Sequence, residues 1–338
     1  MYAALWISLA LLGLLAIALV YRTLMSIRVY GPRIRRMFDE SPIFSPTEGT
    51  PHPNAEEVEF PTTNGLKLRG CYLATPSGKP KALIVFCHEF RSDRWSGVTY
   101  WEFLRQDGFD IFSFDFRNHG TSDSDPNYKP RHWVTDLELA DLEAALRYIR
   151  GRAGSKGLPL GLYGISRGGG AAIGAAARDR TVGDVVTDGA FPTHSTVLSY
   201  MRRWISLIVG NRLLNDWLPS WYLGIVRDAV LAEVERDLGC RFLRLERAIR
   251  RIAPRPLLMI HGGRDSYIPS ELAQRFYERA REPRQFWIVE GARHNACLET
   301  AGDEYRHRVR EFFRNNLAPG NLAPPHIEPS RRLEPATE

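Results

Sequence analysis

The 338-residue chain has few cysteines and very little lysine. The four cysteines lie far apart and match no zinc-site spacing: Cys71, Cys87, Cys240 and Cys297. A reducing compartment is therefore favoured over a disulfide-stapled fold. Nearly all of the 45 basic residues are arginine, and the formal net charge is +6. This charge favours anionic surfaces, but no nucleic-acid-binding motif accompanies it, so we expect no nucleic-acid partner.

The sequence also lacks the motifs of nucleotide and metal enzymes. The stretch "GISRGGG" at residues 164–170 has neither the lysine of a phosphate-binding loop nor the spacing of a dinucleotide fingerprint. "HEFRS", which begins at His88, lacks the second histidine of a zinc-binding helix. We therefore expect no cofactor and no metal.

One long hydrophobic run stands at the start of the chain. "MYAALWISLALLGLLAIALV" has no charged side chain and is long enough to cross about 30 Å of hydrocarbon as a helix. A secretory signal peptide is the alternative, since residues 16–18 (Ala-Ile-Ala) resemble a cleavage site. However, no basic residue precedes the run, and it exceeds the usual apolar length of a signal peptide. We favour an uncleaved, single-pass membrane anchor over residues 1–21.

Charge and composition divide the rest of the chain. Arginines follow the anchor at positions 22, 28, 33, 35 and 36, so the positive-inside rule predicts that the chain after Tyr21 lies in the cytoplasm. Residues 22–55 are basic and contain proline and serine, which is typical of a linker. Residues 319–338 are rich in proline and low in apolar residues, so we expect a disordered tail. One domain without internal repeats remains, at 56–318.

Short apolar runs alternate with amphipathic stretches in this domain. We expect strands at residues 56–60, 66–74, 82–87, 109–116, 158–165, 182–190, 255–262 and 285–291. We expect helices at residues 98–107, 133–151, 169–179, 270–281 and around 305–316, and a helical lid insertion at about 191–253. This order predicts an α/β fold with a mostly parallel, twisted sheet and helices on both faces. Active sites of such folds lie at the carboxyl ends of the strands.

A serine stands where one of these strands meets a helix. Ser166 lies at the centre of Gly164-Ile165-Ser166-Arg167-Gly168. A serine on so tight a turn has a strained backbone, and glycines at the flanking positions avoid collisions with adjacent elements. The first amides of the following helix can stabilise a negative charge. The pattern predicts an exposed nucleophile on a sharp turn.

A serine hydroxyl needs a base, and the base needs a carboxylate that orients it. Asp265 and His294 each follow an expected strand, at the same edge of the sheet as Ser166. The chain order serine, aspartate, histidine is that of hydrolases. Asp188 also follows a strand and is the alternative acid.

Five motifs in chain order resemble those of the α/β-hydrolase fold superfamily. They are "CHEF" at 87–90, "DFRNHGTSD" at 115–123, "GISRGG" at 164–169, "HGGRDSYIP" at 261–269 and "GARHN" at 291–295. Residues from about 56 to 316 are similar to its membrane-associated members, the Bem46-like hydrolases and the serine aminopeptidase-like branch. The motifs are specific to the superfamily and much less specific to any substrate.

The resemblance implies Ser166 as nucleophile, His294 as general base and then acid, and Asp265 as orienting carboxylate. It implies an oxyanion hole made by the backbone amides of Arg167 and of Phe90 or Glu89. The family usually has glycine where this chain has Glu89. A carboxylate there would oppose an oxyanion unless it points away or is paired, for example with Arg91 or Arg94.

Other residues have structural interpretations. We expect hydrogen-bonded structural roles for Asp115, Arg117, His119, His88 and His261. In the insertion, Trp204, Trp217 and Trp221 either line an apolar acyl pocket, touch the bilayer, or simply pack the lid onto the domain. A run of arginines is either a solvated face or a surface for anionic headgroups or an acidic substrate: Arg241, Arg244, Arg247, Arg250 and Arg251.

Together these features predict a membrane-anchored serine hydrolase that cleaves carboxylic esters or thioesters through an acyl-enzyme on Ser166. The expected partner is a small-molecule or lipid-like acyl substrate, and the oligomeric state is unknown. Two alternatives remain: a serine peptidase or aminopeptidase with the same triad, and a catalytically silent, membrane-tethered binding protein.

Overall fold

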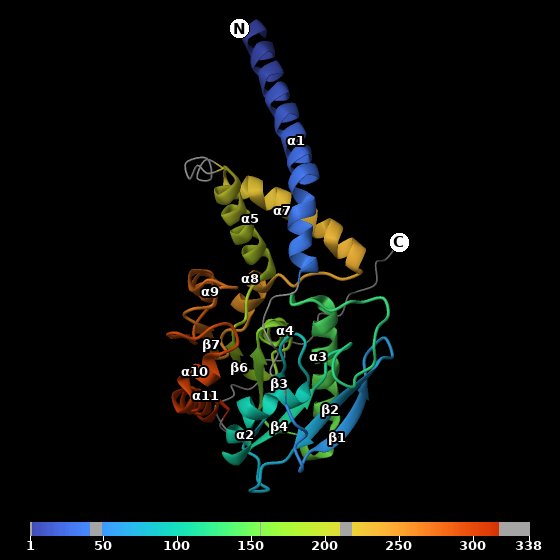
Figure 1. Ribbon diagram of the computed structural model, residues 1–338, viewed down its shortest axis with the longest axis vertical. Coiled ribbons are helices and arrows are strands. Elements are labelled where there is room, and N and C mark those ends of the chain that lie inside the picture. Colours follow the sequence, from blue (N-terminus) through green and yellow to red (C-terminus); the bar gives the residue numbers. More distant parts are fainter. Residues whose placement is uncertain (1, 41–48, 156, 210–217, 318–338) are drawn as a thin grey trace, which may run out of the picture.

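Eight strands form one sheet in the order β1-β2-β4-β3-β5-β6-β7-β8 (Figure 1). The computed structural model describes residues 2–40, 49–155, 157–209 and 218–317. The strands are β1 (Glu56–Pro61), β2 (Lys67–Leu73), β3 (Ala82–Cys87), β4 (Phe109–Phe114), β5 (Leu160–Ile165), β6 (Val182–Asp188), β7 (Leu257–Gly262) and β8 (Arg284–Val289). β1 and β2 form a hairpin, β2 runs antiparallel to β4, and the strands from β4 to β8 are parallel. The predicted mostly parallel sheet is confirmed.

Helices follow most of the parallel strands. They are α1 (Tyr2–Asp39), α2 (Val98–Gln106), α3 (Asp136–Gly151), α4 (Arg167–Arg178), α5 (Thr193–Val209), α7 (Ser220–Leu238), α8 (Leu245–Ala248), α9 (Ser270–Tyr277), α10 (Cys297–Ala301) and α11 (Asp303–Asn316). α3 begins three residues later than expected because Thr135 caps it, in a capping box with Glu138.

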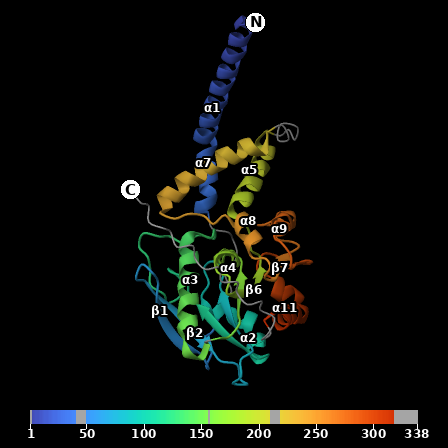
Figure 2. The same ribbon diagram turned by 180° about the vertical axis from the view of Figure 1, so that it is seen from behind.

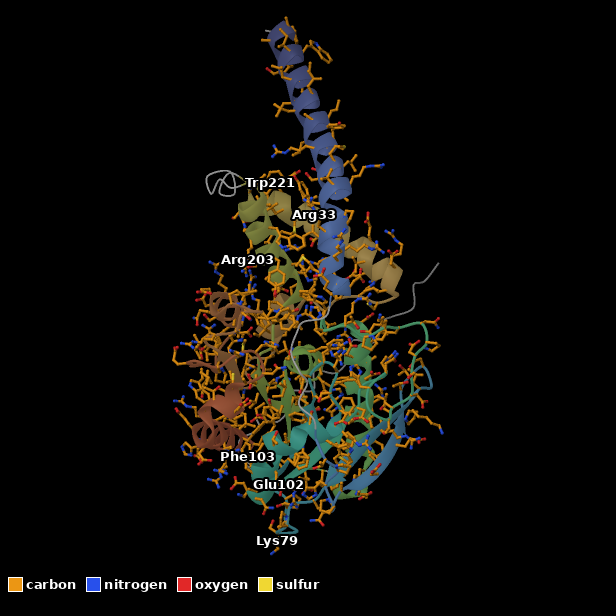
Figure 3. The ribbon with its side chains drawn as sticks, in the orientation of Figure 1. Arg33, Lys79, Glu102, Phe103, Arg203 and Trp221 are labelled. Atoms are coloured by element: carbon orange, nitrogen blue, oxygen red, sulfur yellow. The ribbon has the colours of Figure 1, made fainter. Side chains whose placement is uncertain are left out.

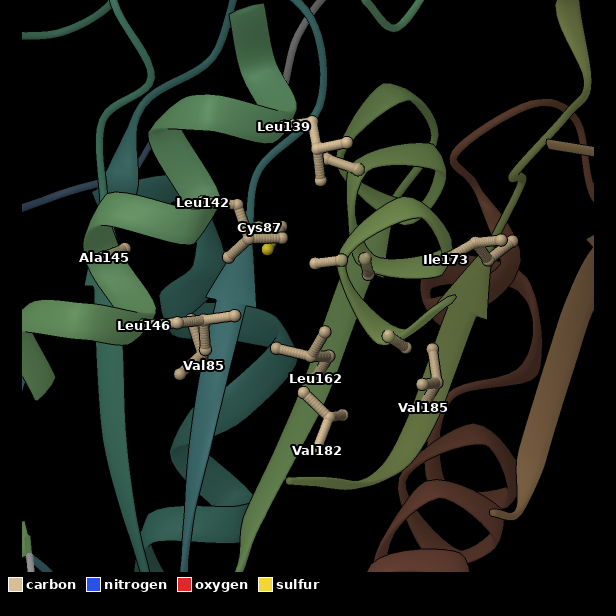
Figure 4. Close-up of a cluster of buried hydrophobic side chains, with 14 of the residues drawn as sticks. Val85, Cys87, Leu139, Leu142, Ala145, Leu146, Leu162, Ile173, Val182 and Val185 are labelled. Carbon is tan, nitrogen blue, oxygen red and sulfur yellow. The ribbon is translucent and has the colours of Figure 1, made fainter. Parts of the chain in front are cut away.

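Two apolar layers cover the two faces of the sheet. Successive side chains of a strand point to opposite faces, so along β3 Val85 and Cys87 contact one layer while Ile84 and Phe86 contact the other. The first layer contains α3, α4 and α9, and Figure 4 shows Leu146 and Leu142 of α3 against Val85 and Cys87 of β3. The second contains α2, α10 and α11. This arrangement leaves the ends of the strands for a site.

The first helix continues well beyond the apolar run. The sequence predicts a linker from residue 22, but α1 extends without a break to Asp39. Ile27, Ile34, Met37 and Phe38 recur at helical spacing and pack in the same apolar cluster as α5 and α7. This packing explains why the basic segment is helical up to Asp39.

α5 and α7 lie between β6 and β7, where the lid insertion is expected. α5 and α7 contact each other, and α7 also contacts α1. The view of Figure 1 and the reverse view of Figure 2 show α1, α5 and α7 together at one end of the molecule, beyond the sheet. The expected tail at 319–338 and Trp217 lie outside the described residues.

Candidate active site

The backbone of Ser166 is strained. Ser166 directly follows β5 and caps α4, with φ 50° and ψ −115°. A positive φ is uncommon for a residue with a side chain and marks functional turns. The Ser166 amide donates to the Asp188 carbonyl at 2.7 Å, which ties the turn to the end of β6. The turn is the sharp one that the sequence predicts.

Two glycines provide the space for this turn. A Cβ at Gly164 would lie 2.5 Å from the Gly168 carbonyl oxygen. A Cβ at Gly168 would overlap the carbonyl oxygen of Cys87, at the end of β3. Backbone cannot move aside as a flexible side chain can, so α4 approaches β3 and β5 this closely only with glycine at both positions.

The loops after β7 and β8 bring two further side chains to Ser166. The Ser166 Oγ lies 2.9 Å from His294 Nε2, and His294 Nδ1 lies 2.6 Å from Asp265 Oδ2. Asp265 Oδ1 accepts hydrogen bonds from the amides of Tyr267, at 2.9 Å, and Ile268, at 2.8 Å. The structure therefore places the three predicted residues in one hydrogen-bonded chain, in which the imidazole can take the serine proton.

Asp265 remains ionised although it is buried. Burial opposes the charge, but the hydrogen bond from His294, the nearby imidazoles of His294 and His261, and the Ile268 amide together hold its pKa below the ordinary value. An ionised carboxylate fixes the Nδ1 proton of His294 and leaves Nε2 as the acceptor facing Ser166.

Asp188, the alternative acid, has other partners. Its Oδ2 accepts from the Tyr305 hydroxyl at 3.0 Å. Burial raises the pKa of Asp188 to about 6, against hydrogen bonds from Cys297 and Tyr305. The geometry therefore favours Asp265 over Asp188 as the partner of His294.

The residues expected to supply the oxyanion hole lie beside the serine in the chain or at the end of β3. Arg167 is the first residue of α4, so its amide is among those without a partner inside the helix. Glu89 and Phe90 follow β3, and both are buried. Arg94 forms its ion pairs with Asp115 and Glu57.

The Arg167 side chain has a role that the sequence did not suggest. Its guanidinium is buried, lies over the rings of Phe90 and Phe116 at 5.2 and 5.5 Å, and donates to His119 Nε2 at 3.1 Å. It also donates to the Arg131 carbonyl at 3.1 Å. These contacts tie the residue after Ser166 to the loop after β4.

The histidines and charged residues of the flanking loops are hydrogen-bonded. His88 Nδ1 contacts the Glu89 carbonyl at 2.7 Å and its Nε2 accepts from the Phe116 amide; burial lowers its pKa to about 3. His261 Nε2 donates to the Ile268 carbonyl at 2.8 Å. Arg117 binds Asp141 through its guanidinium and its amide. These residues shape loops around the serine.

Aromatic side chains close the site. The prediction of an exposed nucleophile is wrong, because Ser166 is only 2% exposed beneath the side chains of the flanking loops. The rings of Phe191 and Tyr267 lie 6.2 and 5.5 Å from that of His294. His132, which sequence reasoning missed, lies 5.4 Å from the Tyr267 ring, and burial lowers its pKa to about 3. No pattern in the sequence singles out His132, because only folding brings its loop to the serine.

The remaining candidates lie on the lid. Trp204 is partly buried in the cluster shared by α1, α5 and α7, whereas Trp221 is 57% exposed. The five arginines of the basic run are all exposed: Arg241, Arg244, Arg247, Arg250 and Arg251. Among the residues that the structure describes, no cluster of three or more metal-ligating side chains is found.

Within the described ranges, α1 is the one helix long and apolar enough to cross a membrane. Its apolar residues 2–21 are exposed throughout.

Known proteins are similar to this chain in sequence and in fold. The uncharacterised protein YfhR of Escherichia coli (strain K12) is 26% identical over 274 residues, which cover 79% of this chain and 84% of YfhR. The thiohydrolase aneE of Aspergillus aculeatus is 35% identical over 130 residues, 37% of this chain and 38% of that protein. The Pyrococcus furiosus esterase Pf2001 has a similar fold, with a TM-score of 0.61 and 22% identity over 82% of this chain and all of the esterase.

The profile of the alpha/beta hydrolase family matches residues 84–308. That range holds the strained serine turn after β5 and the two loops whose side chains meet it. The chain belongs to the alpha/beta hydrolase family.

Proposed function

We propose that this protein is a membrane-anchored serine hydrolase that cleaves carboxylic esters or thioesters. The observation that carries the proposal is the hydrogen-bonded chain from Ser166 through His294 to Asp265, at the carboxyl ends of β5, β7 and β8. An activated hydroxyl, an oriented base and free helix amides are the parts that acyl transfer requires.

In the proposed reaction, Ser166 Oγ attacks the acyl carbonyl while His294 Nε2 takes its proton. The oxyanion of the tetrahedral intermediate lies at the α4 N-terminus, against the amide of Arg167 and that of Phe90 or Glu89. His294 then gives the proton to the leaving oxygen or sulfur, and the acyl-enzyme forms. His294 then deprotonates a water molecule, which attacks the acyl carbon; the bond to Ser166 Oγ breaks, His294 returns the proton to Oγ, and the acid leaves. One oxyanion donor contributes about 10²–10³ in rate in known enzymes.

Two comparisons support an ester or thioester substrate. The Aspergillus relative carries the name thiohydrolase, and the Pyrococcus protein of similar fold is an esterase. Both reactions transfer an acyl group to water, which suits the proposed site. The membrane anchor and the apolar lid favour a lipid-like acyl group.

α1 carries the proposal of membrane anchoring. Its exposed apolar stretch is of spanning length, and arginines begin directly after it at Arg22. Further along the same helix, Ile34, Met37 and Phe38 are buried in the apolar cluster with α5 and α7, which ties the end of α1 to the folded domain.

Labelling with a fluorophosphonate probe tests the serine mechanism. We expect the full-length protein to be labelled and Ser166→Ala to be unlabelled. Ser124→Ala, on an exposed loop, is the matched control and should be labelled like the wild type. Absence of wild-type labelling would favour a silent binding protein instead.

Matched ester, thioester and amide substrates with the same acyl group then separate esterase, thioesterase and peptidase activity. We expect hydrolysis of the ester and thioester. A higher kcat/KM on the amide would support the peptidase alternative.

A further inference from the structure

A cavity of about 210 Å³ lies between α1, α5 and α7. Its apolar wall comes from the lid, with Met201, Trp204 and Ile205 on α5 and Leu223 and Val226 on α7. The wall from α1 is mostly polar. The cavity is smaller than the roughly 300–1,000 Å³ of complete small-molecule sites, so it suits one part of a larger molecule.

The α1 wall is one face of the helix. Arg22, Ser26, Tyr30 and Arg33 follow one another at helical spacing and all line the cavity. The Ser26 hydroxyl lies 2.8 Å from the Tyr222 hydroxyl, and the Arg22 guanidinium lies 5.6 Å from the centre of the Tyr222 ring. A space with one apolar wall and one cationic wall matches an anionic amphiphile.

The position of the cavity indicates where such a molecule comes from. Residues 2–21 of α1 are apolar and exposed, and the cavity wall begins at the next residue, Arg22. If residues 2–21 span the hydrocarbon, the cavity opens at the headgroup layer of the bilayer. Arg33 lies further along α1, away from the N-terminus, at the level where the helix passes α7 (Figure 3).

The two arginines are available to an anion. Both side chains are on exposed residues, and among the described residues neither forms an ion pair with a carboxylate. Guanidinium groups bind phosphate through paired hydrogen bonds, and basic residues next to a membrane attract anionic lipids.

We propose that this cavity binds an acyl chain of an anionic phospholipid drawn from the adjoining leaflet, with the headgroup on the Arg33 side. The inference rests on the proposed membrane insertion of α1 and is independent of hydrolysis. Phe191, whose ring lies 6.2 Å from that of His294, belongs to the same apolar cluster as the cavity walls.

Photo-crosslinking tests the lipid site. The full-length Ser166→Ala protein, in which hydrolysis cannot consume the probe, is placed in lipid nanodiscs that contain phosphatidylglycerol with a diazirine on its acyl chain. Crosslinked peptides are mapped by mass spectrometry. We expect crosslinks on α5 and α7 around Met201 and Leu223, and stronger crosslinking than with the same probe built on phosphatidylcholine.

Two variants and a matched control variant distinguish this site from general membrane contact. Ile205→Trp fills the cavity and should remove most crosslinks on α5 and α7. Arg33→Gln should reduce the phosphatidylglycerol crosslinks at these helices about fivefold. Arg28→Gln removes the same charge from α1 outside the cavity wall and should leave them unchanged. Melting temperatures check that the Ile205→Trp protein is folded, and Arg33→Gln tests the site independently of it.

The outcomes separate the two proposals. Crosslinks confined to residues 2–21 would overturn the lipid site and leave the anchor in place. Equal effects of Arg33→Gln and Arg28→Gln on the crosslinks at α5 and α7 would do the same. Failure of the protein to co-purify with the nanodiscs would overturn membrane insertion and the lipid site together.

Discussion

At Ser166, backbone strain and side-chain position depend on each other. A residue held at such a φ costs about 1–3 kcal/mol, which the surrounding structure must offset. The hydrogen bond from the Ser166 amide to Asp188 and the close approach allowed by Gly168 hold the turn in place. The strained backbone of Ser166 turns its hydroxyl toward His294 and away from α4.

The two candidate acids can be separated by parallel substitutions. Asp265→Asn keeps the shape of the side chain but favours the wrong tautomer of His294, so kcat should fall by about 10³–10⁴. Asp188→Asn keeps an oxygen for the Tyr305 hydroxyl, and kcat should stay within about tenfold of wild type. Steady-state kinetics on a soluble ester measure both. Equal losses would contradict the assignment of Asp265.

The buried carboxyl of Asp188 should make the stability of the protein depend on pH. Its pKa rises from 3.8 to about 6 in the folded protein because it is buried. Between these values the folded state binds more protons than the unfolded state, so this group makes folding less favourable as the pH rises. Relative to wild type, Asp188→Asn should gain about 2 kcal/mol between pH 4 and pH 7. Melting curves in detergent at the two pH values check this, and a constant difference between the proteins would contradict it.

At the scale of elements, the contact of α4 with β3 depends on one glycine. Gly168→Ala places a methyl group against the backbone of Cys87, which cannot yield locally, so we expect a loss of at least about 3 kcal/mol and little folded protein. Gly174→Ala, six residues further along α4, meets only the ends of two flexible side chains, Leu243 and Leu139, and should change stability by about 1 kcal/mol or less. Expression level and melting temperature measure the contrast.

The end of α1 is a part of the folded domain. The Phe38 ring lies 5.1 Å from that of Trp133 and 4.9 Å from that of Phe242, and Arg131 donates to the Phe38 carbonyl. Phe38→Ala should therefore cost about 3–5 kcal/mol. Val29→Ala, at a half-exposed position of the same helix, is the control and should cost less than about 1 kcal/mol. Similar melting temperatures for both variants would show that this end of α1 is not docked.

For the whole molecule, α1 predicts both attachment and orientation. The full-length protein should stay in the membrane pellet after an alkaline carbonate wash, and deletion of residues 2–21 should release it. By the positive-inside rule, the arginines that follow the span predict a domain on the cytoplasmic side. Protease added to inside-out vesicles should digest the domain. Digestion only in intact, right-side-out cells would show that the domain lies on the opposite side of the membrane.

Much of the fold follows from local patterns. Continuous apolar runs such as residues 82–87 predict strands buried on both faces, and β3, β4, β5, β6 and β7 lie within the predicted ranges. The helical spacing of Ile27, Ile34 and Phe38 was also in the sequence, but the surrounding arginines and the proline- and serine-containing stretch that follows them predicted a linker. The segment is buried against α7, which lies about 200 residues further along the chain. Only the fold could therefore show that residues 22–39 form a helix and not a linker.

By itself, the sequence determined the order of strands and helices, the glycines of the serine turn and the apolar span, because each depends on neighbours within a few residues. Tertiary structure alone decided between Asp265 and Asp188 as the partner of His294, since both follow strands and only the crossing of the loops sets the distances. It also decided that α1 docks on the lid and forms a cavity there, because that contact joins segments that no local pattern relates.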